Sequence, residues 1–258
     1  MPSGTIWKGS IHFGDTDVPV KLHSAVKQER IQFHLLHQSD QVRLHQQMFC
    51  AYEKIPVPSE DQIKGFEVEE GKYLIVDPEE LELTTPESSR MIEVHEFVKS
   101  AQISPLYLDH TYYLEPDSDL KAPGYSELAE LLQVMNAAGI CTWTMRKRSY
   151  LGALQASGTL LRLCTMRYAD EVISAASLEL QEIAVSEKEL KIGSDLVNQL
   201  TAPFEPYKFV DEHQQRLQKL INKKARGEKV VLLRPRTLQP TPPDGLLQAL
   251  EASLKKAA

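Results

Sequence analysis

Apolar side chains alternate with polar ones along the first part of the chain. Residues 5–22 contain two such runs, separated by Gly14-Asp15. Alternation with a period of two puts one face of a strand against a core, and a short polar turn between two runs predicts a β-hairpin. The apolar positions are Trp7, Gly9, Ile11, Phe13, Val18, Val20 and Leu22.

Four later segments also predict strands, at residues 72–76, 106–114, 140–148 and 159–168. They are rich in β-branched and aromatic residues and alternate in the same way. This content suits a closed or strongly curved antiparallel sheet. The predicted fold class is therefore α+β, mainly β, with an antiparallel β-barrel core.

A helical spacing interrupts the strands at residues 126–138. Leucines and a methionine stand there at i, i+3, i+4 and i+7, after Pro123-Gly124 and before Gly139. This pattern predicts an amphipathic helix that packs on the sheet. Its apolar face is Leu128, Leu131, Leu132 and Met135.

After Tyr168 helical spacing replaces alternation. Ser186 with Glu189 is typical of a capping box, and it opens a helix that ends before Pro203. A second helix is predicted over residues 211–225, with basic residues near its C-terminus and Gly227 behind it. Such an arm can fold back on its own barrel or cross to another subunit, and the sequence leaves both open.

Residues 234–243 are rich in proline and predict an extended linker. Residues 244–256 then form a short amphipathic unit with a leucine stripe, which would be marginal as an isolated helix. It either docks into a partner's groove or docks back on its own domain. The predicted domains are a core over 1–185, a helical arm over 186–228, and a linker with a terminal segment over 229–258.

The net charge of −7 argues against indiscriminate binding to nucleic acid. The charges are segregated, however: residues 141–168 contain no acid, residues 216–236 contain one, and acid concentrates over residues 53–82. Segregation lets one surface be positive, although a solvated helix face produces the same pattern. The basic residues of the first run are Arg146, Lys147, Arg148, Arg162 and Arg167.

The chain contains none of the common catalytic motifs: no GxSxG, no phosphate loop ending in GK[ST], no HExxH and no Cys/His cluster. His34 and His37 are the nearest approach to a ligand pair, and the carboxylate clusters indicate a solvated acidic surface. We therefore expect a binding protein with no catalytic residue, no metal and no cofactor. The three separated cysteines should be reduced, with Cys141 and Cys164 as small buried hydrophobes.

No segment approaches the roughly 20 apolar residues that a membrane helix needs, and Met1 leads into polar residues without a signal peptide's apolar region. We expect a cytoplasmic protein.

Several segments, taken together and in order, resemble the prokaryotic Ku family, and the resemblance runs from about Ile6 to Gly227. The segments are Ile6–Gly14, Val18–Leu22, Phe33–His37, Ile63–Glu67 leading into Gly71–Tyr73, Pro86–Arg90, Tyr112–Pro116 and Arg167–Val172.

This resemblance implies a Ku core fold, in which a long excursion of the barrel, about residues 41–73, bridges DNA. The C-terminal helices would interlock two subunits into a ring. The homodimer would bind double-stranded DNA ends without sequence specificity, at breaks in the nucleoid, and recruit an ATP-dependent DNA ligase for non-homologous end joining. It would not be an enzyme.

The resemblance also suggests site residues. Phosphate contacts are expected from Arg43, Lys54 and Lys64 on the bridge, from Lys21 near the hairpin, and from Arg146, Lys147 and Arg148 on the strand at 140–148; solvated surface charge is the alternative for each. Dimer-interface candidates are Leu196, Leu200, Phe204, Tyr207, Leu217, Leu220 and Ile221, with ordinary intrachain core as the alternative. Ligase-binding candidates are Leu247, Leu250 and Leu254.

Two departures from the family pattern matter. The bridge has only Cys50, where some relatives have a cysteine pair suited to zinc, so we expect no zinc. The chain has no long lysine-rich extension, which puts tail contacts to internal DNA in doubt. Two rival functions remain: a dimeric barrel scaffold that binds protein but not DNA, and a hydrolase or nuclease with an unrecognised site.

Overall fold

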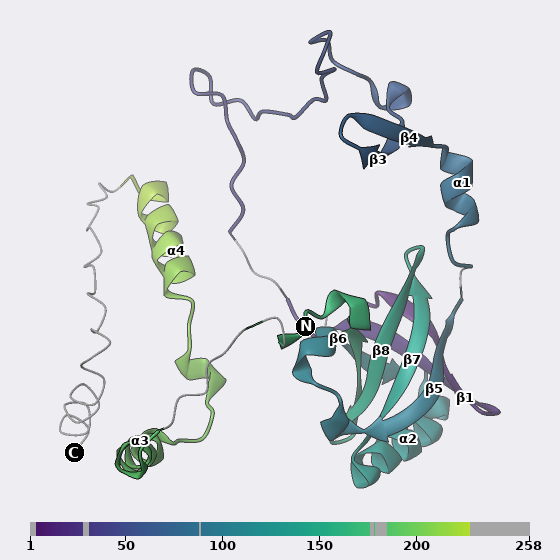
Figure 1. Cartoon of the computed structure of the whole chain (residues 1–258), viewed down its shortest axis with the longest axis vertical. Helices are drawn as coiled ribbons and strands as arrows, with labels where there is room; N and C mark the ends of the chain where they lie inside the picture. Colours follow the sequence, from purple (N-terminus) through teal and green to yellow (C-terminus); the bar gives the residue numbers. More distant parts are fainter. Residues whose placement is uncertain (1–3, 28–30, 88, 176–177, 179–184, 228–258) are drawn as a thin grey trace. The chain divides into compact units, whose positions relative to one another are not determined.

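The computed structural model describes residues 4–27, 31–87, 89–175, 178 and 185–227 (Figure 1). They divide into two compact units. The first contains the described residues up to 175, apart from 31–33. The second contains residues 31–33, 178 and 185–227.

The first unit is built on a closed barrel in the order β1-β2-β6-β9-β8-β7-β5. The predicted barrel is confirmed. Its strands are β1 (Trp7–Phe13), β2 (Thr16–Ser24), β5 (Met91–Lys99), β6 (Leu108–Pro116), β7 (Ala137–Met145), β8 (Arg148–Ser157) and β9 (Leu160–Met166).

One pairing in the barrel is parallel. β1 and β5 run in the same direction, from Ser10 opposite Met91 to His12 opposite Glu93. The barrel was predicted to be antiparallel, and the other six pairs of neighbouring barrel strands are antiparallel; this seam is the exception. The reason is topological, because the chain leaves β2 and re-enters at β5 at the same end of the barrel where β1 begins.

The predicted hairpin and the strands at 72–76, 106–114 and 159–168 are all present, with small shifts of their ends. β5 escaped prediction because it has a bulge between Val94 and Glu96, which breaks the alternation that a pattern search needs. β8 escaped because small residues, including Gly152 and Ala153, occupy its middle.

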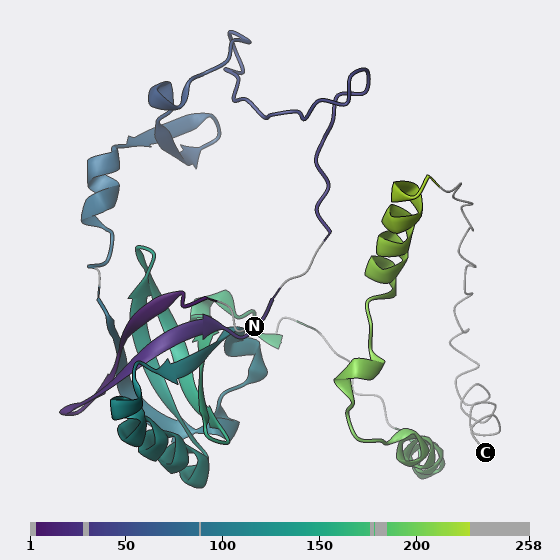
Figure 2. The ribbon, with the colours of Figure 1, turned by 180° about the vertical axis from the view of Figure 1, so that it is seen from behind.

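The hydrophobic core fills the barrel interior and continues under α2 (Ala122–Met135). α2 lies at one end of the barrel in both views (Figure 1, Figure 2). Its Tyr125 hydroxyl donates to the Leu114 carbonyl at 2.7 Å and accepts from the Leu161 amide at 2.8 Å. The largest fully buried side chains are Ile11, Val20, Leu22, Ile92, Leu114, Leu154, Leu161 and Leu163.

α2 differs from the predicted helix in its bounds and in its buried face. It begins before Pro123 and ends at Met135, because Asn136 has a left-handed φ of 47° and β7 starts immediately afterwards. Two of the predicted core residues, Leu131 and Met135, are half exposed. Leu128 and Leu132 are buried as predicted, together with Tyr125 and Ala129, so the face is rotated from the predicted one.

Between β2 and β5 the chain makes an excursion over residues 25–90 (Figure 1). It contains the hairpin of β3 (Lys64–Glu69) with β4 (Lys72–Val76), followed by α1 (Pro78–Leu83). Every residue of β3 is exposed, and α1 buries none of its side chains.

The second unit has two described α-helices, α3 (Glu187–Leu200) and α4 (Glu212–Ala225), where the sequence predicted them. The capping box of α3 is confirmed: the Ser186 amide donates to Glu189 Oε2 at 2.9 Å, and the Glu189 amide donates to Ser186 Oγ at 3.3 Å. Asp211 caps α4 through the Gln214 amide. Neither helix buries a side chain.

Short 3-10 helices lie at Ser59–Asp61, Ser100–Gln102, Pro105–Tyr107, Asp119–Lys121, Ala169–Glu171 and Pro206–Lys208. In the described part of the chain, no helix has the length and apolar character needed to cross a membrane.

Candidate functional site

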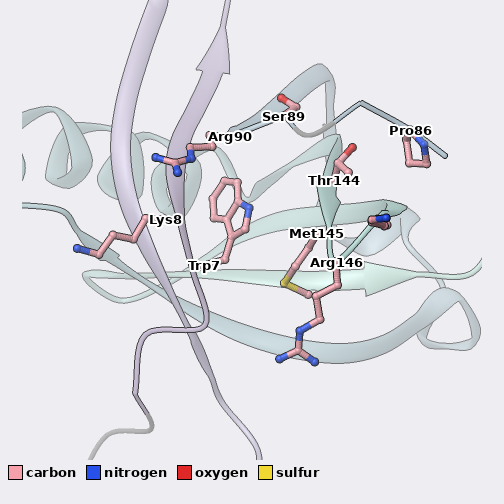
Figure 3. Close-up of a pocket in the computed structure, with 9 residues that line it drawn as sticks. Trp7, Lys8, Pro86, Ser89, Arg90, Thr144, Met145 and Arg146 are labelled. Atoms are coloured by element: carbon pink, nitrogen blue, oxygen red, sulfur yellow. The ribbon is translucent and has the colours of Figure 1, made fainter. Parts of the chain in front are cut away.

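A cleft of about 470 Å³ opens where β7 ends, away from α2, which leads into the start of β7; Figure 3 shows the residues that line it. Three segments that are far apart in the sequence meet there: the start of β1, the return of the excursion before β5, and the end of β7 with the turn after it. The lining residues are Trp7, Lys8, Pro86, Ser89, Arg90, Thr144, Met145, Arg146 and Lys147.

The parallel seam between β1 and β5 builds one wall of the cleft. The Ser10 amide donates to the Arg90 carbonyl at 2.9 Å, which brings Arg90 beside β1. A Cβ on Gly9 would lie 2.2 Å from the Arg90 carbonyl oxygen and 2.1 Å from the Trp7 ring. Only glycine therefore lets the indole lie over β1 while the Arg90 backbone approaches, which gives a physical reason for the Trp7-Lys8-Gly9 sequence.

The turn between β7 and β8 builds the opposite wall. Its central residues, Arg146 and Lys147, have φ values of 53° and 62°. Two positive φ values in a two-residue turn are typical of a type I′ hairpin, where Asn-Gly fits with least strain. Arginine and lysine adopt this left-handed conformation at a cost in conformational energy. Residues with such backbone strain are concentrated at functional sites.

The prediction of one strand over 140–148 is therefore wrong at its end. β7 stops at Met145 and Arg148 already opens β8, with Met145 and Arg148 paired across the turn. The side chains of Arg146, Lys147 and Arg148 are exposed at this hairpin instead of alternating between two faces of a strand.

The cleft is positively charged. Lys8, Arg90, Arg146 and Lys147 all contribute to its lining, and none of the lining residues that the structure describes is acidic. Lys147 Nζ lies 3.6 Å from Glu82 Oε1, and Lys8 Nζ lies 4.0 Å from Asp117 Oδ1. These four side chains are 46–76% exposed, so water screens both pairs, neither holds its cation strongly, and both lysines stay available to an anion.

Aromatic side chains support this end of the barrel from inside. Trp143 stacks on Tyr150 with ring centroids 5.3 Å apart, and His110 meets Tyr112 edge-on at 5.3 Å. Burial raises the pKa of Tyr112, Tyr150 raises it further, and Arg146 lowers it. Trp143 and Tyr150 face each other across β7 and β8, two residue pairs from the turn that contains Arg146 and Lys147.

The predicted phosphate-contact residues lie in different parts of the structure. Arg146 and Lys147 line the cleft, and Arg148 follows them. Lys21 is mostly covered, opposite Lys8 on β1, with its Nζ 3.7 Å from Asp117. The remaining three, Arg43, Lys54 and Lys64, lie on the excursion with exposed side chains, and none of them lines the cleft.

Sequence reasoning missed Lys8 and Arg90. Both stand inside segments that carried the family resemblance, Ile6–Gly14 and Pro86–Arg90, which was the available signal. The basic run over 141–168 also contains a structural cation. Arg167 donates to the Leu106 and Leu108 carbonyls at 2.9 and 2.7 Å and to Asp109 at 3.0 Å.

The arm residues predicted for an interface are not buried in this chain. Leu200, Phe204 and Tyr207 are 68%, 79% and 95% exposed. Leu196, Leu217, Leu220 and Ile221 are partly exposed. The ligase-binding candidates Leu247, Leu250 and Leu254 lie outside the described residues.

No group of three or more His, Cys, Asp or Glu residues suited to a metal ion occurs in the part of the chain that the structure describes. His37 contacts Asp40, with its Nδ1 2.9 Å from Oδ1. Cys141 and Cys164 are buried free thiols, as predicted, and burial raises the pKa of Cys141 to about 12. Such a thiol is a poor nucleophile and metal ligand at neutral pH.

Comparison with known proteins adds independent information. A family profile described as the Ku70/Ku80 beta-barrel domain matches residues 12–192. The chain is 75% identical to "Non-homologous end joining protein Ku 2" of Geotalea uraniireducens (strain Rf4) over the whole of both chains. It is 39% identical to "Non-homologous end joining protein Ku" of Anaeromyxobacter sp. (strain K), over 87% of this chain and 76% of that protein. It is 33% identical to the protein of the same name from Solibacter usitatus (strain Ellin6076), over 98% and 93%.

Proposed function

The chain belongs to the Ku family of non-homologous end joining proteins, and from that premise we propose that it binds ends of double-stranded DNA as a homodimeric ring. The ring reads no sequence, and it recruits an ATP-dependent DNA ligase that joins the ends. The observation that carries the proposal is the basic cleft, where Lys8, Arg90, Arg146 and Lys147 converge at one end of the barrel.

The charge distribution supports phosphate binding at the cleft. The chain has a net charge of −7, yet the described lining of the cleft has four cations and no carboxylate. Cations that contact phosphates supply affinity without base readout, and a closed ring admits only free ends. We assign further phosphate contacts to Arg148 and Lys21 on the barrel and to Arg43, Lys54 and Lys64 on the excursion.

The two arm helices support dimerisation. α3 and α4 are amphipathic, each 14 residues long, and bury no side chain. An obligate dimer interface resembles a hydrophobic core shared between two chains, so its leucines are partly exposed when one chain is considered alone. We place the dimer contact on Leu196, Leu200, Phe204, Tyr207, Leu217, Leu220 and Ile221.

Ligase recruitment rests on the family relationship and on the leucine stripe near the C-terminus. Leu247, Leu250 and Leu254 would present one apolar face to a groove of the ligase. Truncation before residue 244 should then abolish ligase stimulation and leave DNA binding intact.

A protein-binding scaffold is the second candidate. The acidic excursion favours it, because Glu67, Glu69, Glu70, Glu79 and Glu80 lie on or beside exposed apolar strands and α1. Such a surface repels DNA phosphates and suits a protein partner. The DNA-binding experiment below separates this scaffold from the Ku-like ring.

The decisive experiment compares linear with covalently closed circular duplex of the same sequence across a salt series. We expect strong preference for linear DNA, affinity that falls as salt rises, and trapped dimers when both ends are blocked after loading. Equal binding to both forms would contradict threading, and no binding at low salt would favour the scaffold.

A variant pair ties binding to the cleft. Arg146→Ala with Lys147→Ala should weaken end binding and lower the salt slope by about one per lost phosphate contact. Lys72→Ala is the matched control, since it removes an exposed cation of the excursion that pairs with Glu69 and does not line the cleft.

A further inference from the structure

The cleft has a shape that a contact to duplex backbone does not require. Phosphates on the outside of a duplex are reached by side chains on an open surface. Here the cations surround a recess of about 470 Å³, within the roughly 300–1,000 Å³ typical of sites for small ligands. A recess of this size is large enough for a single nucleotide.

The recess also contains an aromatic wall. Figure 3 shows Trp7 amid the basic side chains of Lys8, Arg90 and Arg146. The missing Cβ of Gly9 leaves room for the indole against β1, so its position is set before any ligand arrives. Trp7 is half-buried and packs against the edge of the hydrophobic core, whereas Trp143, the other tryptophan of the chain, is 3% exposed inside the core.

Cations and an indole together match one chemical class. Proteins bind single-stranded nucleic acid by stacking bases on aromatic rings and by contacting the backbone with Lys and Arg. Arginine can hold a phosphate through two parallel hydrogen bonds, and every base has a π-face, so this recognition tolerates any sequence. The hydroxyls of Ser89 and Thr144 add donors and acceptors at the rim.

We propose that this cleft binds one unpaired nucleotide at a DNA end, with the base against Trp7 and the phosphate among Lys8, Arg90, Arg146 and Lys147. The inference rests on the proposed function and deepens it. The protein binds an overhanging end through the cleft and also through its contacts with the duplex. A blunt end has no unpaired nucleotide and makes only the duplex contacts.

The test uses the full-length protein and three phosphorylated duplexes with the same paired region: blunt, with a 3′ overhang, and with a 5′ overhang. Affinity and tryptophan fluorescence are measured in parallel. We expect roughly tenfold tighter binding to at least one overhang, the stacking energy of about one base, with quenching absent for the blunt duplex.

Variants assign the effect to the cleft. Trp7→Leu should bring the ratio of overhang to blunt affinity to about one and remove the quenching, because Trp143 is shielded in the core. Arg90→Ala should reduce the same ratio, and the control Lys72→Ala should leave it unchanged. A wild-type ratio of one without quenching would overturn the proposal and assign the cleft to duplex phosphates.

A second titration separates this inference from the proposed function. Short single-stranded oligothymidylate is added to the wild type and to Trp7→Leu, with inorganic phosphate in a parallel series. Quenching of the wild type alone by the oligonucleotide supports the cleft even if duplex ends do not bind. No response to the oligonucleotide, with normal binding of blunt ends, would overturn the cleft proposal and leave end binding standing.

Discussion

The barrel and the helical arm follow the same sequence rule and reach opposite outcomes. α2, α3 and α4 are each 14 residues long. α2 buries Tyr125, Leu128, Ala129 and Leu132 against the barrel, and the arm helices bury nothing. An amphipathic helix therefore has a face that favours burial, but its sequence does not specify which surface will cover that face. The barrel finds its core within one chain, and we attribute the exposed arm to a core completed by a second chain.

The strongest test of this contrast is removal of a core leucine. Leu161 is 0% exposed inside the barrel. Leu161→Ala should lower the free energy of unfolding by about 2–5 kcal/mol, since it loses buried area and leaves a cavity. Chemical denaturation measures the change, which should not depend on protein concentration. The matched variant Leu200→Ala, at a position 68% exposed, should leave barrel unfolding nearly unchanged; equal losses would break the comparison.

The arm should show the reverse behaviour. Leu217→Ala with Leu220→Ala removes two partly exposed side chains of one helix face. If they form the dimer contact, the dimer dissociation constant should rise about a hundredfold or more, because interface centres concentrate binding energy. Sedimentation across a concentration series measures it. Gln215→Ala, at an exposed position on the opposite face of α4, is the control, and an unchanged dissociation constant in the leucine variant would place the interface elsewhere.

The polar link between α2 and the barrel should contribute less than a core leucine. Tyr125→Phe removes the hydroxyl that joins the Leu114 carbonyl to the Leu161 amide and leaves both groups buried. We expect a loss of about 1–3 kcal/mol in the free energy of unfolding. Leu120→Ala, which alters a residue 92% exposed just before α2, should change it far less.

The smallest effect is expected at the start of α3. Ser186→Ala should destabilise this helix by about 1 kcal/mol. Hydrogen bonds from the Ser186 hydroxyl and amide lower the pKa of Glu189. Because the folded pKa lies below its unfolded value, the carboxylate stabilises the helix at neutral pH, and this contribution disappears as pH falls through the folded pKa.

Circular dichroism between neutral and acid pH tests the cap. The wild type should lose helical signal on acidification, and Glu189→Gln should show a weaker dependence on pH. A parallel loss in both proteins would show that the cap carboxylate is not the group responsible.

Local patterns were sufficient for much of the fold. Alternation located the first hairpin and most barrel strands, and Ser186 with Glu189 located the start of α3. Two of the failures depend on a neighbour that is distant in the sequence. The bulge in β5 is defined by its partner β7, and the true face of α2 is defined by hydrogen bonds of Tyr125 to two strands.

The candidate site was predictable only in part. The run of basic residues identified Arg146 and Lys147 as candidates, but they were predicted to lie in a strand. Their positive φ values define a turn, and a local sequence pattern predicts positive φ only where glycine or asparagine stands. Lys8 and Arg90 are isolated cations in the sequence. They belong to the site because the parallel β1–β5 seam brings them together.

The sequence by itself carried the family resemblance in its motifs, and it determined most barrel strands, the two arm helices and the segregation of charge. The strands, helices and charge pattern follow from periodicity, capping chemistry and composition, which act within a few residues of the chain. Only the tertiary structure decided which cations share a cleft and which one supports a loop, since closing the barrel joins residues 7–8, 86–90 and 144–147. That closure is a long-range event, and local sequence carries no measure of it.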